Sequence, residues 1–318
     1  MTALIEAERL SRRFAARGLL SRAAPVQAVT EFSLAIGRGE AVGLVGESGS
    51  GKSTIGRLLL GLLAPSEGTV RLDGRPLGGA ALRRRMQLVF QDPYSSLDPR
   101  RRVGAQVADG LAIHRLGART ERPARVAALL AQVGLPPEHA HRYPHEFSGG
   151  QRQRIGLARA LATGPEFLVA DEPVSALDVS VQAQVLTLLA DLRLRLGLAL
   201  LFISHDLPVV RSLCDRVVVL YLGRVMEEGP AEAVFGRPAH PYTRALLSAS
   251  PSLDPARRRA RILLAGDPPS AAAPPSGCVF RTRCPWVVPA CAEAVPPPLV
   301  VGAGHRAACI RSELWLGT

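Results

Sequence analysis

Lysine is almost absent from this sequence. Lysine and arginine together account for 39 of the 318 residues, and Lys52 is the only lysine among them. Arginine presents a planar fork of donors, whereas lysine carries a compact ammonium group on a flexible stem. Since arginine supplies the positive charge at every other position, we expect position 52 to need a point charge that a guanidinium cannot provide.

Aromatic residues and long uncharged apolar runs are also scarce. Phe, Trp and Tyr make up 4% of the chain, and they are not interleaved with the arginine clusters as in proteins that stack single-stranded bases. We therefore interpret the net charge of +12 as dispersed over solvated faces, which argues against a nucleic-acid partner. The most apolar stretch, residues 186–203, is broken by Asp191, Arg193 and Arg195, so it does not have the pattern of a membrane helix.

The beginning of the sequence has no secretory pattern. Residues 1–10 carry acidic side chains and no apolar core segment. We therefore expect a cytoplasmic protein, and any membrane association would come through a partner. A cytoplasmic location also argues against disulfide bonds between the five cysteines.

A complete phosphate-binding motif surrounds the single lysine. It matches the pattern G-x-x-x-x-G-K-[ST] and comprises Gly46, Glu47, Ser48, Gly49, Ser50, Gly51, Lys52, Ser53 and Thr54. A buried strand is predicted at 40–45, and a helix is predicted after the loop, with Ile55, Leu58, Leu59 and Leu62 on one face. Backbone N–H groups at a helix N-terminus favour an anion. We expect Lys52 to reach the β- and γ-phosphates of a ligand and the Ser53 hydroxyl to ligate Mg²⁺.

Two adjacent carboxylates end a second apolar segment. Residues 167–170 are predicted to form a buried strand, which Asp171 and Glu172 follow. Ligands of α/β proteins bind at the carboxyl ends of the strands. We expect Asp171 to hold Mg²⁺, through its water shell, and Glu172 to orient and polarise the attacking water.

Strands and helices alternate through much of the chain. Further strands are predicted at 68–74 and 198–203, a helix at 181–196, and a hairpin that turns at Gly223. This alternation predicts an α/β fold with a mostly parallel sheet and helices on both sides.

Two regions depart from the alternating pattern. Residues 92–164 show helical segments without clear strands, which predicts an inserted helical subdomain. Residues 236–318 are richer in Pro, Ala and Ser and contain four of the five cysteines. We predict a core domain at 1–235 and a small Cys-containing domain at 236–318, connected through a Pro-rich segment at 267–276.

The segment FSGGQRQR at 147–154 connects the chain to a known family. Its residues Ser148, Gly149, Gly150 and Gln151 resemble the LSGGQ signature of ATP-binding-cassette (ABC) ATPases, with Phe147 in place of Leu. A serine and two glycines that open a helix form a second phosphate cradle. The resemblance implies a P-loop NTPase core and a head-to-tail pair of subunits. Each ATP would then lie between the phosphate loop of one subunit and the signature of the other.

Other positions match the same family in order and spacing. The resemblance implies that Gln91 touches Mg²⁺ and couples to the membrane partner, that Asp178 belongs to the D-loop, and that His205 contacts the γ-phosphate. Phe14 is the candidate for the aromatic ring that stacks on adenine. The predicted catalytic residues are Lys52, Glu172 and His205, and the predicted Mg²⁺ ligands are Ser53, Gln91 and Asp171.

Several longer segments resemble the dipeptide/oligopeptide importer branch of this family: residues 91–99, 143–154, 171–186 and 240–247. The resemblance implies an ATPase at the cytoplasmic face of the inner membrane, with a paralogous second ATPase, two transmembrane permease subunits and an extracytoplasmic peptide-binding protein. A nickel complex or glutathione remains open as the cargo. A soluble cassette ATPase acting on nucleic acid or ribosomes is disfavoured, because the chain has one cassette and a short spacing between its motifs.

Four cysteines gather near the end of the sequence. Cys278, Cys284, Cys291 and Cys309 are spaced C-x5-C-x6-C-x17-C, which is unlike the C-x2-C pairs of zinc ribbons. Four thiolates can hold a [4Fe–4S] cluster, and the pattern resembles one in the same importer branch. Zinc and unligated thiols remain the alternatives. Cys214, which precedes an apolar strand, is predicted to be a small buried residue.

Overall fold

A computed structural model describes residues 3–15, 24–92, 96–175, 177–250 and 261–313. The chain divides into two compact units. Unit 1 comprises residues 1–5, 36–40 and 71–202, and unit 2 comprises residues 6–35, 41–70 and 203–318. Each unit is described by itself below.

The sheet of unit 1 is built from apolar strands. Strand β6 (Met86–Val89) pairs in parallel with β7 (Phe167–Asp171), and β8 (Ala199–Ile203) lies on the other side of β7. Every residue of β7 and β8 is buried. Continuous apolar runs of this kind are typical of parallel strands that are covered on both faces. The strands predicted at 167–170 and 198–203 are therefore confirmed.

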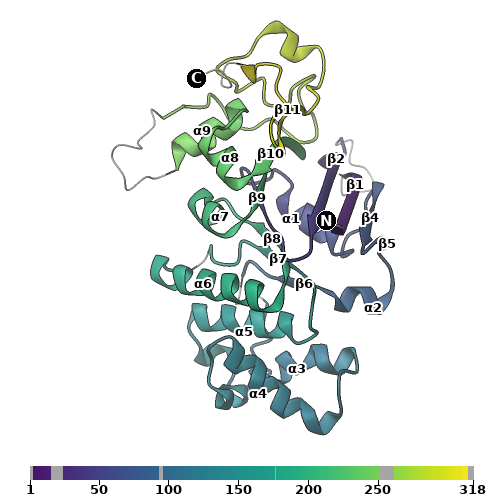
Figure 1. Ribbon diagram of the computed structural model, residues 1–318, viewed down its shortest axis with the longest axis vertical. Coiled ribbons are helices and arrows are strands. Elements are labelled where there is room, and N and C mark those ends of the chain that lie inside the picture. Colours follow the sequence, from purple (N-terminus) through teal and green to yellow (C-terminus); the bar gives the residue numbers. More distant parts are fainter. Residues whose placement is uncertain (1–2, 16–23, 93–95, 176, 251–260, 314–318) are drawn as a thin grey trace. The chain divides into compact units, whose positions relative to one another are not determined.

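Unit 1 also contains numerous helices. In chain order they are α2 (Gly79–Arg84), α3 (Val103–Ile113), η1 (Arg119–Glu121), α4 (Arg122–Gln132), η2 (Pro137–His141), η3 (Pro144–Glu146), α5 (Gly149–Leu161) and α6 (Val179–Leu196). Helices α3, α4 and α5 pack on one another, and α5 also packs on α6, as the teal helices of Figure 1 show. The described residues between 92 and 164 form helices and no strand, as the periodicity predicted, while the limits of the proposed subdomain stay a prediction.

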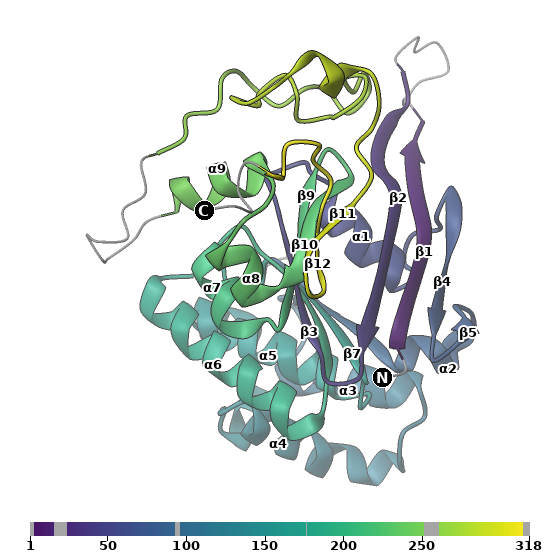
Figure 2. The ribbon, with the colours of Figure 1, turned by 45° about the horizontal axis from the view of Figure 1, so that its top comes forward.

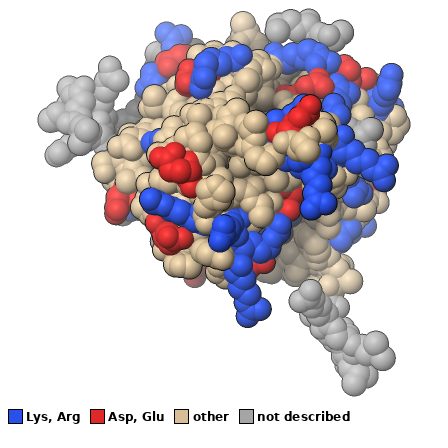
Figure 3. Space-filling view, turned by 90° about the horizontal axis from the view of Figure 1, so that it is seen from below, with Lys and Arg blue, Asp and Glu red and all other residues tan. Residues whose placement is uncertain are grey.

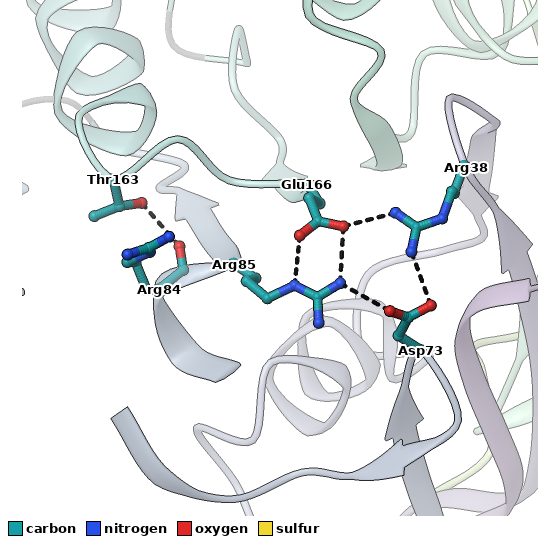
Figure 4. Close-up of polar contacts among 6 residues, drawn as sticks. All are labelled: Arg38, Asp73, Arg84, Arg85, Thr163 and Glu166. Atoms are coloured by element: carbon teal, nitrogen blue, oxygen red, sulfur yellow. Dashed lines mark hydrogen bonds and ion pairs between the residues drawn. The ribbon is translucent and has the colours of Figure 1, made fainter. Parts of the chain in front are cut away.

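A charged network lies where β6 and β7 begin. Glu166 accepts hydrogen bonds from Arg85, one of them at 2.8 Å from Nη2, and another at 2.7 Å from Arg38 Nη1. Asp73 accepts from the same two arginines, and Figure 4 shows the four side chains joined in a closed ring of contacts. The Arg85 hydrogen bonds are the main cause that lowers the pKa of Glu166 to about 2. The network ties the segment after α5 to the strands of unit 1.

The main sheet of unit 2 mixes parallel and antiparallel strands. Strand β3 (Ala41–Val45) runs parallel to β9 (Arg216–Tyr221), and β9 forms an antiparallel hairpin with β10 (Arg224–Pro230). Two short strands continue it, because β12 (His305–Ala307) pairs with β10 and β11 (Leu299–Gly302) pairs with β12, both antiparallel. The predicted hairpin is confirmed. The prediction of a mostly parallel sheet does not hold for the strands of unit 2, because β10, β12 and β11 pair antiparallel.

A second sheet was missed in the sequence. This sheet contains β2 (Val26–Gly37), β1 (Ala3–Phe14) and β4 (Glu67–Leu72), in that order, and most residues of each strand belong to unit 2. Figure 2 shows the two long strands β1 and β2 next to each other. Within unit 1, β4 pairs antiparallel with β5 (Arg75–Pro76). Strand β1 alternates imperfectly and carries Glu and Arg side chains, so its period-2 pattern is weak.

The helices of unit 2 are α1 (Lys52–Leu59), α7 (Leu207–Leu213), α8 (Ala231–Gly236), α9 (Pro241–Ala249) and η5 (Pro289–Ala292). The apolar face predicted for the first of them is buried at Ile55, Leu58 and Leu59. Leu62 does not belong to that face and is 60% exposed. The helix ends earlier because Gly61 adopts a left-handed conformation with φ +64°.

Two observations concern the hydropathy and the charge of the described residues. None of their helices has both the length and the apolar character that a bilayer crossing requires. On the face drawn in Figure 3, acidic side chains lie among the basic ones, and uncharged surface separates them. This mixture fits a dispersed positive charge on that face.

Candidate active site

The phosphate loop of unit 2 connects β3 to α1, as predicted. Its backbone depends on glycine at two close approaches. A Cβ atom at Gly46 would lie 2.2 Å from the carbonyl oxygen of Leu220, and one at Gly51 would lie 2.4 Å from that of Ala28. Both glycines also have positive φ angles, 151° and 102°. Only glycine therefore allows the loop to fold this tightly against the neighbouring strands.

Lys52 curls back over this loop. The residue is 6% exposed, and its Nζ atom donates to the carbonyl oxygens of Gly46 at 2.8 Å and Glu47 at 2.9 Å. Ser50 Oγ is buried and has no hydrogen-bond partner within the described residues. A Cβ atom added at Gly49 would meet no atom within 4 Å. A tight loop with a buried ammonium group and a buried hydroxyl fits a phosphate group, which supplies acceptors for both.

The remaining residues of the motif follow the same pattern. Ser48 is exposed, whereas Ser53 and Thr54 are half-buried in the first turn of α1. The chemistry of the Ser53 hydroxyl, an oxygen donor beside a phosphate site, suits Mg²⁺.

In unit 1, the two predicted carboxylates stand at the end of β7. Asp171 is the last strand residue and is 8% exposed. Glu172 has a φ of +46°, which is uncommon for a residue with a side chain, and its Oε2 accepts a hydrogen bond of 3.0 Å from Gln91 Nε2. Strained conformations of this kind concentrate at functional sites. The structure thus brings Gln91 and Glu172 together, two positions that the sequence separates by 81 residues.

A side chain that the motifs did not predict supports the loop after Glu172. Gln182 in α6 donates to the carbonyl oxygens of Val174 at 2.9 Å and Leu177 at 3.0 Å. Asp178 is the N-cap residue of α6 and is exposed. Its neighbour Ala176 lies outside the described residues. Gln182 was missed because its contacts follow from the fold of the loop and leave no local pattern.

The signature residues of unit 1 open α5. The Ser148 and Gln151 side chains form a capping box, in which Ser148 N donates to Gln151 Oε1 at 3.0 Å and Gln151 N donates to Ser148 Oγ at 3.4 Å. Gly149 and Gly150 are the first two residues of the helix. Phe147 is buried against the ring of His139, with centroids 5.2 Å apart. The departure from Leu at this position is thus accommodated by the local core.

The two other predicted residues belong to unit 2. His205 is exposed and follows β8, and the next residue, Asp206, caps α7 by accepting from Val209 N at 3.3 Å. Phe14 ends β1 with 37% exposure, and Arg12 Cζ lies 4.8 Å from its ring centroid. An exposed ring at a strand end can stack on a base.

The four C-terminal cysteines also lie in unit 2 and line a single cavity of about 10 Å³. All five cysteines of the chain are free thiols, and Cys214 is buried as predicted. Burial raises the pKa of Cys284 to about 11 and that of Cys309 to about 12. Within the described residues, no group of three or more His, Cys, Asp or Glu side chains is arranged to hold a metal ion. The donor set suits a metal cluster, whereas the cavity has room for about one water molecule.

Two C-terminal residues contact the phosphate loop, which sequence motifs did not predict. Tyr242 Oη accepts a hydrogen bond of 2.8 Å from Glu47 N, and Arg283 Nη1 donates to Glu47 Oε2 at 2.7 Å. These contacts join residues that are 195 and 236 positions apart. No local signal in the sequence could have revealed them.

Comparison with known families gives two matches. Residues 29–175 match the family "ABC transporter", and residues 226–291 match the family "Oligopeptide/dipeptide transporter, C-terminal region". The first match includes the phosphate loop, Gln91, the signature and both carboxylates. The second match includes three of the four C-terminal cysteines, Cys278, Cys284 and Cys291, and ends before Cys309. The domain limits at 235 and 236 stay predictions.

Individual relatives cover nearly the whole chain. A Brucella ovis protein named as a peptide import ATP-binding protein is 55% identical over an alignment of 317 residues, which covers 98% of this chain and 100% of that protein. A Sinorhizobium fredii protein named as a peptide ABC transporter ATP-binding protein is 48% identical and covers 96% of this chain and 89% of its own. Among solved structures, a dimeric ATP-binding cassette in a post-hydrolysis state with ADP and Pi has a TM-score of 0.63 and 30% identity. It covers 71% of this chain and 98% of that one.

Proposed function

The chain belongs to the ATP-binding proteins of ABC transporters, and on this premise we propose that it is the ATP-hydrolysing subunit of an importer for di- and oligopeptides. One observation carries the proposal: relatives named for peptide import match nearly the whole chain, and part of it matches the oligopeptide/dipeptide C-terminal region. The P-loop fold and the intact site residues support the hydrolytic role.

The residues of the phosphate loop bind and orient the nucleotide. Lys52 leaves the Gly46 and Glu47 carbonyl oxygens and donates to the β- and γ-phosphates, and the loop N–H groups hold the same anion. Phe14 stacks on the adenine. Ser53, Gln91 and Asp171 hold Mg²⁺, which neutralises phosphate charge when bound.

Glu172 is the proposed base. It accepts a proton from the attacking water, while Gln91 orients its carboxylate through the hydrogen bond to Oε2. His205 contacts the γ-phosphate and stabilises the charge that develops there.

Two subunits complete each site in this proposal. The signature residues Ser148–Gln151 and the D-loop residue Asp178 face the nucleotide of a partner ATPase, in a head-to-tail dimer with a paralogue. Support comes from the dimeric relative with ADP and Pi. The partners across the membrane are two permease subunits and an extracytoplasmic peptide-binding protein, so the chain works at the cytoplasmic face of the inner membrane. A permease partner supplies the membrane span, for which the described residues contain no helix.

The C-terminal cysteines are proposed to hold a [4Fe–4S] cluster. All four cysteines line one cavity, and Arg281 and Arg311 line it as well, so the positive charge nearby suits an anionic cluster. The side chains must move apart to admit it, because the cavity measures only about 10 Å³. Binding would release protons, since burial keeps the free thiols protonated.

Uptake of a labelled dipeptide tests the transport function. Cells that lack this chain receive the wild-type chain, Glu172→Gln, or Glu138→Gln as a control on an exposed glutamate. We expect wild type and Glu138→Gln to restore uptake, and Glu172→Gln to bind ATP while turnover falls about 10²–10⁴-fold. If ATP hydrolysis is normal but dipeptide uptake does not depend on the chain, the peptide assignment is wrong. Unchanged turnover in Glu172→Gln would reject Glu172 as the base.

Metal analysis tests the cluster separately. The full chain, purified without oxygen, should contain about four iron and four sulfide per chain and absorb visible light. Cys291→Ser should lose both. Stoichiometric zinc, or a chain without metal, would contradict the cluster, whatever its transport activity.

A further inference from the structure

Glu47 contacts both Lys52 and two residues of the C-terminal region. Its carbonyl oxygen accepts from Lys52 Nζ at 2.9 Å, its N–H donates to Tyr242 Oη at 2.8 Å, and its carboxylate accepts from Arg283 Nη1 at 2.7 Å. The second residue of the phosphate loop is thus held at its backbone and at its side chain. We propose that Tyr242 and Arg283 are positioning residues that hold the phosphate loop ready for ATP, which rests on the ATPase function proposed above.

The Tyr242 hydroxyl is placed by a rigid aromatic core. Tyr242 is 0% exposed, and its ring centroid lies 4.8 Å from that of Tyr221 and 5.2 Å from that of Phe280. Burial raises the pKa of Tyr242, so the hydroxyl stays neutral and accepts the Glu47 N–H without adding charge beside the phosphates.

The helix that carries Tyr242 is itself anchored. Its first turn is capped by His240 Nδ1, which accepts from Tyr242 N at 3.0 Å. Glu227 in β10 is fully buried and accepts from Ala239 N at 2.7 Å and His240 N at 2.9 Å. His305 Nε2 lies 2.7 Å from the same carboxylate. Because each of these groups is buried, the start of α9 cannot shift without loss of several hydrogen bonds.

Arg283 has an electrostatic role at the loop. Its side chain is 10% exposed and that of Glu47 is 26% exposed, so the ion pair is shielded from solvent. Without Arg283, the Glu47 carboxylate would place an unpaired negative charge in the same loop that must bind the ATP phosphates. The arginine therefore fixes the carboxylate and cancels its repulsion of the nucleotide. The adjacent Tyr221 Oη, 3.4 Å from Arg283 Nη1, helps to orient the guanidinium.

The charge argument is tested by a double-mutant cycle on ATP affinity in the full chain. We expect Arg283→Met to weaken ATP binding about tenfold at low salt and less at high salt, because salt screens the repulsion. Glu47→Gln removes the repelling charge, so the double variant Glu47→Gln/Arg283→Met should return close to the wild-type affinity. Arg211→Met is the matched control, since that arginine also forms an ion pair with a glutamate, Glu232, through Nη2 at 2.7 Å. It should bind ATP as the wild type does.

The hydroxyl is tested by Tyr242→Phe, which keeps the buried ring. We expect about a threefold rise in the ATP dissociation constant with no change in its salt dependence, because no charge is altered. The positioning role is overturned if Arg283→Met and Tyr242→Phe both bind ATP like wild type, or if the double variant is as weak as Arg283→Met. A wild-type chain that binds no ATP contradicts the proposed ATPase, whereas normal binding in all variants contradicts the positioning role alone.

Discussion

The two phosphate cradles of the chain differ in how they are built. The phosphate loop (residues 46–52) packs against neighbouring strands, requires positive φ at Gly46 and Gly51, and buries its lysine. The signature (residues 148–151) is an ordinary helix start whose serine is exposed and whose cap is made by its own side chains. The phosphate loop is therefore folded in advance as an anion-binding site within unit 2. The signature presents only an exposed helix N-terminus, which suits contact with a nucleotide that is bound to another subunit.

Of the substitutions considered, replacement of the only lysine should lower ATP turnover the most. In Lys52→Arg, we expect ATP turnover to fall at least about 10²-fold, because a planar guanidinium cannot occupy the 6% exposed site with both carbonyl contacts at Nζ. The measurement is steady-state hydrolysis together with ATP affinity. Arg57→Lys makes the opposite exchange at an exposed position of α1 and should leave both unchanged. Normal turnover in Lys52→Arg would mean that composition alone explains the single lysine.

A negative charge at the signature should lower ATP turnover without lowering ATP binding. Aspartate and asparagine both cap helices as well as serine does, so Ser148→Asp and Ser148→Asn should fold alike. Only the aspartate would repel the phosphates of the partner's nucleotide. We expect Ser148→Asp to bind ATP normally and to lose turnover about 10²-fold with its partner ATPase present, whereas Ser148→Asn keeps most of it. Equal turnover in the two variants would show that the signature does not face a phosphate.

The same contrast explains what the sequence could predict. Both cradles, the two carboxylates and their strands are contiguous patterns, so residues 46–54 and 167–172 were predicted from local spacing. Strand β1 was missed because charged residues interrupt its alternation. Strand β2 was missed although its residues 32–36 alternate between buried and exposed. The contacts of Glu47 with Tyr242 and Arg283 escaped for another reason. They join distant segments through tertiary packing, which no local period records.

Glycine serves a different purpose in each cradle. Gly150 lies inside α5, where a Cβ atom would come within 2.3 Å of Val181 Cγ1 in α6. Gly150→Ala should therefore cost about 1–3 kcal/mol through overpacking. Gly156→Ala in the same helix is the control, since its Cβ would meet nothing within 4 Å. It should stabilise the protein by up to about 1 kcal/mol. Chemical denaturation of both variants measures the difference. Equal stabilities would show that α5 and α6 pack less closely than described.

The smallest effect concerns the far end of the signature helix, where Glu166 joins Arg85 and Arg38 (Figure 4). The pKa of Glu166 is lowered to about 2, chiefly by the Arg85 hydrogen bonds. A lowered carboxyl pKa contributes stability above its unfolded value of about 4.3, and that stability is lost as pH falls towards 2. Because the Glu166 side chain is 36% exposed, solvent screens the pair, and Glu166→Gln should cost only about 1 kcal/mol at pH 7. The difference in unfolding free energy between wild type and variant should be smaller at pH 3 than at pH 7, and it should disappear only as the pH falls below the folded pKa of Glu166. A difference that stays constant with pH would mean that Glu166 acts through packing and not through its charge.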